Sequence, residues 1–468
     1  TSKQTHLAKT VIIACGNGAF RPRKLDVENA EAYENSNLHY FVTNLERFRD
    51  RTVAICGGGD SAVDWALALE PIAKKVTIVH RRDALRAQKI LQDRAFANEK
   101  MDFLWNKAVE EISGDEQKVT HVTLRDTQTQ ELSKVEAAGV FIYVGLLPLT
   151  EPFKDLGITN EEGWIVTNEK METSIPGIYA VGDVIEVTHF ITNKKVRLTL
   201  AGPAQRQARA VADHLYGRTY RNTGVIGSSV VKIFDYTAAS TGLNEKDCKK
   251  LGIDYDIAYI IPKDKVGLIP SANPIHFKLI FQVPTGQILG AQSVGMGTVE
   301  KRVDVIAAMI MNRANIEDLK ELELCYSPYY TTAKDATNMA ALVACNILNG
   351  EYKQVRTAEV RRLVEEGAYI IDSRERVEYE AGHIKGAVNI PLSEFRDRLD
   401  EIPTDRPVYV HCLSSQRSYY MVRELNLRGY KNVVNISGSF LGISLYEYFT
   451  DVTTGREPIV TNYRFKLL

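Results

Sequence analysis

Short runs of apolar residues alternate with helical stretches in the first half of the chain, and turn residues separate them. This pattern predicts an α/β fold in which helices join buried strands. A strand at 51–56, a helix at 63–69 and a strand at 76–79 have the spacing of a βαβ unit. The other elements expected in this part are strands at 10–15, 119–124, 140–144 and 178–181 and a helix at 201–216.

The pattern changes after Gly217. Strands with polar turns between them predict an antiparallel sheet, and two helices and a linker follow. The strands are expected at 225–234, 255–261, 277–281 and 288–294, the helices at 300–311 and 333–348, and the linker at 349–351. A third α/β unit is predicted after the linker, with strands at 369–372, 408–411 and 433–436.

The composition excludes several classes of protein. The chain has 468 residues, of which 44% are hydrophobic, and its net charge is −1. Such a chain is neither disordered, nor membrane-spanning, nor a nucleic-acid binder that depends on a basic surface. Six cysteines lie far apart without a CxxC pair, which is typical of free thiols in a reducing, cytoplasmic compartment. No metal site is predicted.

A glycine-rich turn joins the strand at 51–56 to its helix. Gly57 and Gly59, with Ala62 after them, form the pattern GxGxxA. The first glycine permits the tight turn, the second lets the backbone approach a pyrophosphate, and the alanine keeps the helix close to the strand. With Asp60 and Ser61 at the start of the helix, the turn predicts a dinucleotide site. Glycines that serve packing alone are the alternative.

The end of the next strand indicates which dinucleotide is bound. An NAD site carries an acidic residue about 20 positions after the glycines, but this chain has His80, Arg81 and Arg82 there, followed by Arg86. Clustered guanidinium groups bind a 2′-phosphate through charge-assisted hydrogen bonds. The pattern therefore favours NADPH, and the alternative is a solvated basic start of a helix.

These residues resemble a known family. Segments 57–62 and 80–87 are similar to the NADPH domains of thioredoxin reductases and of thioredoxin-reductase-like ferredoxin–NADP reductases. Segment 139–148 also resembles thioredoxin reductases, which makes Gly145 a cofactor contact. That family carries a redox CxxC just before the glycine strand, but residues 40–44 of this chain contain no cysteine. The resemblance therefore argues against thioredoxin reduction.

Another segment resembles the returning part of the FAD domain in two-dinucleotide flavoproteins. The predicted strand at 178–181 ends in Gly182-Asp183, and the resemblance implies that this aspartate holds the ribityl chain of FAD. The alternative is a turn with an N-capping aspartate. Segment 200–207 resembles the flavin-facing helix of CoA-disulfide reductases, which adds two candidate FAD contacts, Ala201 and Ala204.

The family places the other half of the FAD domain, with a GxGxxG turn, before the first strand of this chain. The sequence begins at Thr1, shortly before that strand. We therefore expect either a piece of a longer flavoprotein or an incomplete mosaic.

Segments 234–244 and 325–335 resemble the dimerisation domain of CoA-disulfide reductases and their NADH-oxidase relatives. The resemblance implies a homodimer in which Tyr330 matches a tyrosine that reaches the partner's active site. An interface aromatic that only packs is the alternative. A second family tyrosine is absent, because residues 267–270 read Gly-Leu-Ile-Pro.

The region 355–448 resembles a single-domain rhodanese, through segments 372–375, 382–391 and 411–418. Cys412 opens a loop in which backbone N–H groups favour a thiolate, and this thiolate can carry sulfane sulfur as a persulfide. Arg417 is expected to orient an anionic donor. The family's Gly-Gly-x-x-x-Trp segment is altered at 438–442. We expect His383 to stabilise a turn and the remaining cysteines to pack in the core: Cys15, Cys56, Cys248, Cys325 and Cys345.

The predicted fold class is α/β: a Rossmann-like, two-dinucleotide-binding flavoprotein core that lacks its N-terminal FAD half, an α+β dimerisation domain and an α/β rhodanese domain. The expected segments are an FAD-domain remnant (1–37), an NADPH domain (38–147), a returning FAD segment (148–217), a dimerisation domain (222–348), a rhodanese-like domain (354–450) and a tail (451–468).

The predicted function is an NADPH- and FAD-dependent oxidoreductase that acts on a CoA disulfide, a persulfide or a polysulfide, with a rhodanese domain as sulfur carrier. Three alternatives remain open: a sulfurtransferase on a non-catalytic NADPH-binding scaffold, a ferredoxin–NADP reductase activity, and a non-enzymatic module that responds to NADPH. No nucleic-acid or membrane partner is expected.

Overall fold

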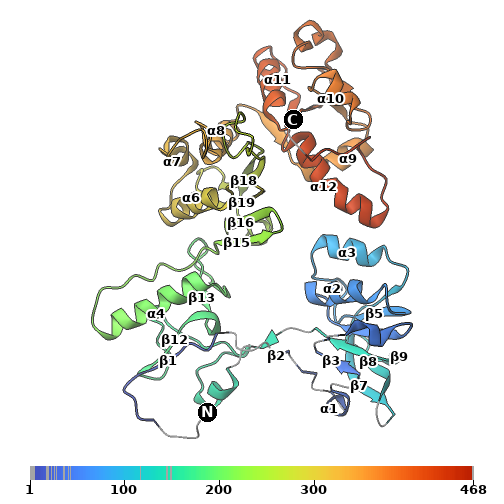
Figure 1. The fold of residues 1–468 in the computed structure, drawn as a ribbon, viewed down its shortest axis with the longest axis vertical. Coiled ribbons are helices and arrows are strands. Elements are labelled where there is room, and N and C mark those ends of the chain that lie inside the picture. The colour runs from blue at the N-terminus through green and yellow to red at the C-terminus, as the bar shows by residue number, and fades with distance from the viewer. Residues whose placement is uncertain are drawn as a thin grey trace. The chain divides into compact units, whose positions relative to one another are not determined.

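The computed structural model describes residues 6–465 apart from 17–20, 23, 26, 28, 35, 36, 41, 43, 116, 117, 144, 145, 148 and 149. The chain divides into two compact units. Figure 1 shows the order of the helices and strands along the chain. The first unit holds Thr1–Glu186, Ala201–Asn222 and Phe449–Arg456, and the second holds Val187–Leu200, Thr223–Tyr448 and Glu457–Leu468. None of the described helices has both the length and the apolar character needed to span a bilayer.

A five-stranded parallel sheet, ordered β3–β10–β4–β5–β6, lies at the core of the first unit. The strands are β3 (Leu38–His39), β4 (Thr52–Cys56), β5 (Lys75–Val79), β6 (Met101–Leu104) and β10 (Val140–Ile142), and two helices, α2 (Asp60–Leu69) and α3 (Lys89–Phe96), connect them. Val53 and Ile55 of β4 pack in the same cluster as α2, whereas Ala54 and Cys56 face the opposite side. Strands buried on both faces require continuous apolar runs, so the βαβ prediction is confirmed.

The opposite face of this sheet packs against a three-stranded antiparallel sheet, β7 (Lys107–Gly114), β8 (Val119–Asp126) and β9 (Leu132–Glu136). Only β8 was predicted. Most β9 side chains are exposed, so this strand lacks the apolar positions that would mark it in the sequence. The unit also contains β1 (Val11–Ile13), β2 (Arg21–Pro22), α1 (Ala30–Tyr33), η1 (Leu45–Phe48), β11 (Leu146–Leu147), η2 (Glu151–Leu156), β12 (Ile178–Ala180), η3 (Gly182–Val184) and α4 (Ala201–Leu215).

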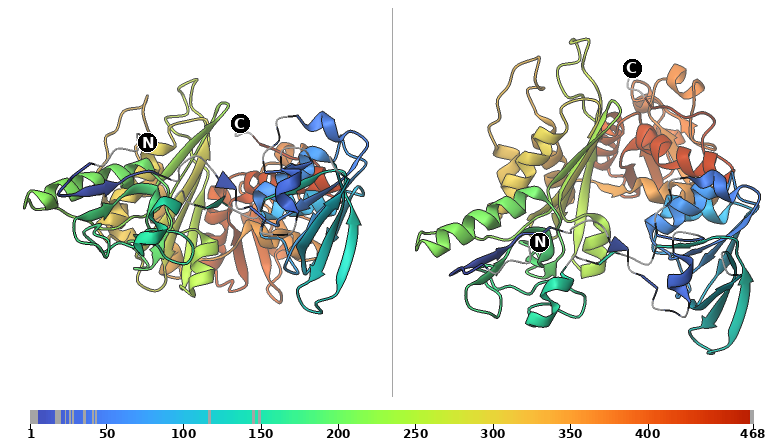
Figure 2. Two further views of the ribbon diagram at one scale, coloured as in Figure 1. Left: turned by 90° about the horizontal axis from the view of Figure 1, so that it is seen from below. Right: turned by 60° about the horizontal axis from the view of Figure 1, so that its bottom comes forward.

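The second unit begins with a hairpin and a five-stranded antiparallel sheet, ordered β15–β16–β19–β18–β17. The prediction of an antiparallel sheet is confirmed, but β16 was not among the four predicted strands, because its residues are mostly small and polar. Helices α6, α7 and α8 lie along the face of this sheet where Phe277, Leu279 and Phe281 are fully buried (Figure 2). Helix α5 packs on the other face, where its Cys248 contacts the cluster that contains Ile280. The elements are β13 (Val187–Thr188), β14 (Lys195–Val196), β15 (Ser229–Ile233), β16 (Tyr236–Gly242), α5 (Glu245–Leu251), β17 (Tyr255–Ile260), β18 (Ile275–Gln282), β19 (Ile288–Gly295), α6 (Glu300–Met311), α7 (Ile316–Glu321) and α8 (Ala336–Leu348).

A parallel sheet ordered β20–β24–β23–β21–β22 completes the second unit. Its strands β21 (Tyr369–Asp372), β23 (Val408–His411) and β24 (Val433–Ile436) have the predicted bounds. Around them lie β20 (Lys353–Val355), η4 (Thr357–Glu359), α9 (Val360–Glu365), α10 (Arg376–Glu380), β22 (Val388–Asn389), η5 (Phe395–Asp397), η6 (Leu399–Glu401), α11 (Gln416–Leu427) and α12 (Ser439–Thr454).

Candidate functional site

The glycine loop (57–60) joins β4 to α2 at the carboxyl end of the parallel sheet. Gly57 has a φ of +145°, and a Cβ there would lie 2.5 Å from the carbonyl oxygen of Tyr143. A Cβ on Gly58 would lie 2.5 Å from the ring of His80, whereas one on Gly59 would meet nothing within 4 Å. Packing therefore requires the first two glycines, and the backbone of Gly59 faces open space.

The loop between β5 and α3 (residues 80–88) carries three arginines, and it folds back onto the glycine loop. The N–H groups of Arg86 and Ala87 donate to the carbonyl oxygen of Gly58 at 2.6 and 3.1 Å. The N–H of Gln88 donates to Oδ1 of Asp60 at 2.7 Å. The side chains of three arginines are exposed, and they form no ion pair with any described residue: Arg81, Arg82 and Arg86. The structure thus brings the predicted phosphate-binding residues beside the predicted dinucleotide turn. Ser61 and Ala62 lie in the first turn of α2.

His80 is buried between these two loops, and its Nε2 has no hydrogen-bond partner among the described residues. Burial lowers the pKa of His80, and Arg86, Arg82 and Arg81 lower it further. The imidazole is therefore neutral near pH 7, and it adds no charge to the site.

The predicted flavin segment is held by α4. The N–H of Gly182 donates to Oε1 of Gln207 at 2.8 Å. A Cβ on Gly182 would lie 3.5 Å from Cβ of Ala204, so the turn carrying Asp183 rests on this helix. Ala201 is the first residue of α4. Gln207, which orients the turn, was not among the predicted site residues, and Gly145 lies outside the described residues.

Tyr330 is 70% exposed, on a loop that a buried charge network holds in place. Nη2 of Arg302 lies 3.0 Å from Oδ2 of Asp335, and the hydroxyl of Thr331 donates to the same oxygen at 2.5 Å. Burial alone would raise the pKa of Asp335, but the Thr331 hydroxyl and Arg302 outweigh it and lower the pKa. A fixed loop therefore presents an exposed tyrosine, as an interface residue requires.

The cysteine loop (412–417) joins β23 to α11. Cys412 is 1% exposed, and its N–H donates to Oγ of Ser439 at 3.1 Å. The hydroxyls of Ser418 and Ser439 lie 3.6 and 3.9 Å from its Sγ. Two hydroxyls beside the sulfur can stabilise negative charge on it.

The start of α12 fixes the orientation of this loop. The N–H of Phe440 donates to the carbonyl oxygen of Cys412 at 3.0 Å, and that of Leu441 donates to the carbonyl oxygen of Leu413 at 3.1 Å. Because a trans peptide directs its N–H opposite to its C=O, the N–H groups of Leu413 and Ser414 point away from α12. This arrangement supports the predicted anion nest.

Arg417 lies at the start of α11 and binds Glu378 with two hydrogen bonds, of 2.6 and 2.8 Å. These bonds raise the pKa of Arg417. Burial would raise the pKa of Glu378, but Arg417 outweighs it and lowers the pKa. Glu378 was not predicted as a site residue, because it lies on α10, a separate element that only the fold brings to Arg417.

The cysteine predictions are partly wrong. Cys56, Cys248 and Cys345 are buried, but Cys15 and Cys325 are exposed. Cys15 follows β1, whose sheet has a single neighbouring strand, β12, and Cys325 lies in the loop between α7 and α8. His383 lies in a turn, where its Nδ1 is 2.9 Å from the carbonyl oxygen of Tyr379.

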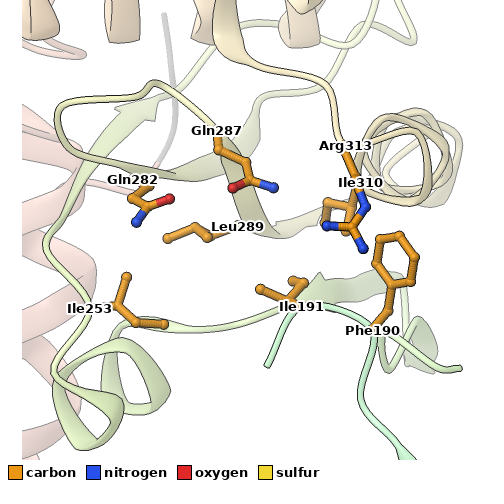
Figure 3. A pocket seen from close by; sticks show the side chains of 8 residues that line it. All are labelled: Phe190, Ile191, Ile253, Gln282, Gln287, Leu289, Ile310 and Arg313. Carbon is orange, nitrogen blue, oxygen red and sulfur yellow. The ribbon is translucent and has the colours of Figure 1, made fainter. Parts of the chain in front are cut away.

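Figure 3 shows a cavity of about 150 Å³ elsewhere in the second unit. Its apolar walls come from the loop after β13, from β19 and from the end of α6. The guanidinium of Arg313 lies 5.0 Å from the centre of the Phe190 ring. None of the eight residues that line this cavity is a predicted site residue, so it belongs to neither candidate site.

Three family models match the chain. The pyridine nucleotide-disulphide oxidoreductase model covers residues 1–208, the dimerisation domain of these oxidoreductases covers 228–337, and the rhodanese-like domain covers 356–445. Thioredoxin reductase of Bacillus subtilis is 51% identical over 180 residues, which are 38% of this chain and 56% of that protein. Ferredoxin–NADP reductase of Halalkalibacterium halodurans is 45% identical over 184 residues, 39% of this chain and 56% of that protein. The chain thus spans about half the length of these curated relatives.

Two solved structures resemble nearly the whole chain. Reduced CoADR-RHD of Bacillus anthracis is 33% identical with a TM-score of 0.68, and the match covers 96% of this chain and 79% of that one. An NAD-dependent persulfide reductase from A. fulgidus is 28% identical with a TM-score of 0.67, and the match covers 92% of this chain and 79% of that one. The resemblance inferred from the motifs is therefore confirmed: the chain belongs to the pyridine nucleotide-disulphide oxidoreductase family and carries a rhodanese-like domain.

Proposed function

We propose that this chain serves an NADPH- and FAD-dependent reduction of a sulfur compound, with Cys412 as the sulfur carrier. The open space over Gly59 and the unpaired arginines beside it fit a dinucleotide that bears a 2′-phosphate. Asp183, Ala201 and Ala204 fit one side of a flavin site, since the turn and the helix that carry them are bound together. When bound, the two groups supply hydride and electron transfer.

The observation that carries the proposal is the geometry of the cysteine loop. The Cys412 thiolate attacks the sulfane sulfur of a donor, a new S–S bond forms, and the donor's S–S bond breaks. Its electron pair leaves with a thiolate or a sulfite, so the exchange needs no external electrons. A second thiolate then takes the outer sulfur and restores Cys412. The names of the two similar structures support a CoA disulfide or a persulfide as the acceptor class.

A second copy of the chain is the proposed partner. β15 exposes Val230, Val231 and Ile233, and Phe234 after it is 93% exposed. A row of apolar side chains on a sheet is typical of a protein interface. It belongs to the segment that the dimerisation model matches, which supports a homodimer presenting Tyr330 to its partner.

The test is mass spectrometry of the full chain after incubation with thiosulfate or glutathione persulfide. We expect one added sulfur atom on Cys412, no such product in Cys412→Ser, and an unchanged product in the control Cys325→Ser, which removes an exposed thiol. An added sulfur atom that is still found in Cys412→Ser would overturn the proposal that Cys412 is the sulfur carrier.

The second candidate is a sulfurtransferase on a scaffold that binds NADPH without turnover. It is favoured by the cysteine loop, because Ser439 and Glu378, which form hydrogen bonds with this loop, both lie in the second unit. NADPH oxidation by the FAD-supplied chain in the presence of CoA persulfide separates the two functions. NADPH oxidation that depends on the persulfide supports the reductase. Sulfur transfer at a rate that NADPH does not change supports the sulfurtransferase on a non-catalytic scaffold.

A further inference from the structure

Outside the rhodanese-like segment, Tyr259 of β17 lies against the wall of the Cys412 site. A Cβ on Gly442 would lie 3.1 Å from Cε1 of Tyr259, and one on Gly438 would lie closer still. These two glycines flank the first turn of α12, in the segment where the chain departs from the rhodanese pattern. The absence of side chains at both positions is what allows the ring to reach this turn.

We propose that Tyr259 is a positioning residue for Cys412, because its ring fixes the first turn of α12 and that turn holds the cysteine loop. The proposal rests on the proposed sulfur transfer at Cys412. It assigns a role in that chemistry to the antiparallel sheet of the dimerisation segment.

The turn touched by Tyr259 makes three hydrogen bonds to the backbone of the cysteine loop. Oγ of Ser439 accepts the N–H of Cys412 at 3.1 Å. The N–H groups of Phe440 and Leu441 donate to the carbonyl oxygens of Cys412 and Leu413. A shift of this turn therefore moves the peptide groups on both sides of the sulfur-bearing residue.

A second contact joins the same sheet to the loop directly. Leu413, the residue after the nucleophile, forms a buried cluster with Ile261 and Leu441, and Tyr259 packs against that cluster. Ile261 directly follows β17. The end of this strand therefore contacts the cysteine loop both through α12 and through a side chain of the loop itself.

Tyr259 is itself held firmly. Its hydroxyl forms a hydrogen bond of 2.7 Å with Nδ1 of His276 on the neighbouring strand. Burial lowers the pKa of His276 to about 4, so the imidazole is neutral near pH 7 and brings no charge to this contact. Nε2 of Gln354, on β20, donates to the carbonyl oxygen of Ile257, on β17, at 2.8 Å. This bond links β17 to β20.

The test compares the full-length wild type with one control variant and four test variants: Tyr259→Ala, Tyr259→Phe, Gly442→Ala and the double variant Tyr259→Ala/Gly442→Ala. One readout is the rate of Cys412 alkylation by iodoacetamide, followed by peptide mass spectrometry, which requires no turnover. The other is kcat and KM for sulfur transfer from thiosulfate. Tyr255→Ala is the matched control, since Tyr255 lies on the same strand and contacts Arg356 rather than the cysteine loop.

We expect Tyr259→Ala to speed alkylation of the buried thiol and to lower kcat about tenfold, because a displaced nucleophile loses its alignment. Tyr259→Phe keeps the aromatic ring, so its alkylation rate and its kcat should equal those of the wild type. Gly442→Ala places its methyl against the ring and lowers kcat, although alanine suits a helix interior. The double variant is no worse than Tyr259→Ala alone, because the methyl then meets no ring.

Unchanged alkylation and kcat in both Tyr259→Ala and Gly442→Ala would overturn the positioning role, even if Cys412→Ser abolishes transfer. A loss of kcat in Tyr255→Ala equal to that in Tyr259→Ala would also overturn it, because general loosening would then explain both. If the wild type transfers no sulfur, the proposed function fails, whereas the alkylation rates still decide whether Tyr259 positions Cys412.

Discussion

The glycine loop after β4 and the cysteine loop after β23 both join a buried parallel strand to the start of a helix. Their charges differ. The arginines beside the glycine loop are exposed and have no ion-pair partner among the described residues, whereas Arg417 is bound to Glu378. An unpaired cation can bind a ligand of high negative charge, while a paired one contributes fixed geometry. The first loop is therefore suited to binding a polyanion, and the second to holding a nucleophile in place.

Each loop has a buried histidine at the carboxyl end of a strand: His80 directly follows β5, and His411 is the last residue of β23. Nε2 of His80 and Nε2 of His411 have no hydrogen-bond partner in the part of the chain that the structure describes. Burial lowers the pKa of both, but the neighbouring arginines lower that of His80 further, whereas Asp372 opposes the effect at His411. Both rings are neutral near pH 7, so the charge of each site is set by its arginines and carboxylates.

The largest expected effect separates two roles of glycine in the first loop. Gly59→Ala places a methyl group where the pyrophosphate is expected, and overpacking by about 3 kcal/mol would weaken NADPH binding about 100-fold. The melting temperature should not change, since that methyl meets no atom of the described residues within 4 Å. Gly57→Ala, with its φ of +145° and its contact with Tyr143, should lower both the affinity and the melting temperature. Titration calorimetry and thermal unfolding measure the pair, and normal binding by Gly59→Ala would contradict the assigned ligand pose.

The next effect concerns the exposed arginines. Arg81→Ala with Arg82→Ala removes two cations from the 2′-phosphate site, and a loss of about 2 kcal/mol corresponds to about 30-fold weaker NADPH binding. NADH, which lacks that phosphate, should bind as before. Arg94→Ala removes an exposed arginine from α3 and serves as the control. An equal loss of affinity for NADPH and for NADH would show that these two side chains do not recognise the 2′-phosphate.

Removing the partner of Arg417 tests the other half of the comparison. Glu378→Gln keeps an oxygen acceptor but removes the negative charge, so the cysteine loop comes to resemble the glycine loop. We expect KM for thiosulfate to fall about fivefold, or about 1 kcal/mol, and the melting temperature to fall because Arg417 loses a charged hydrogen bond. Glu380→Gln, at an exposed position of the same helix, is the control. A higher KM would indicate that Glu378 holds Arg417 in the geometry that binds the donor.

The sequence predicted the elements whose apolar pattern is continuous, and it located both loops from motifs that are local in the chain. β21, β23 and β24 are buried parallel strands, and their predicted bounds match the structure. β9 was missed because its side chains are mostly exposed. Glu378 and Tyr259 escaped prediction for a different reason: each acts on a loop far from it in the sequence, and no local spacing records such a contact.

The smallest expected effect follows from the neutral state of His80. In the free protein, burial and three arginines hold its pKa below the ordinary value. The phosphate of a bound dinucleotide would offset the positive charge of those arginines and raise the pKa, so binding takes up a fraction of a proton. Affinity for NADPH should therefore rise as the pH falls, by about twofold from neutral to mildly acidic conditions. Calorimetry in two buffers of different ionisation enthalpy measures the uptake, and His80→Gln should abolish it. Equal proton exchange in the wild type and in His80→Gln would mean that the ligand's phosphates lie away from this histidine, and it would contradict the assigned role of the glycine loop as the polyanion site.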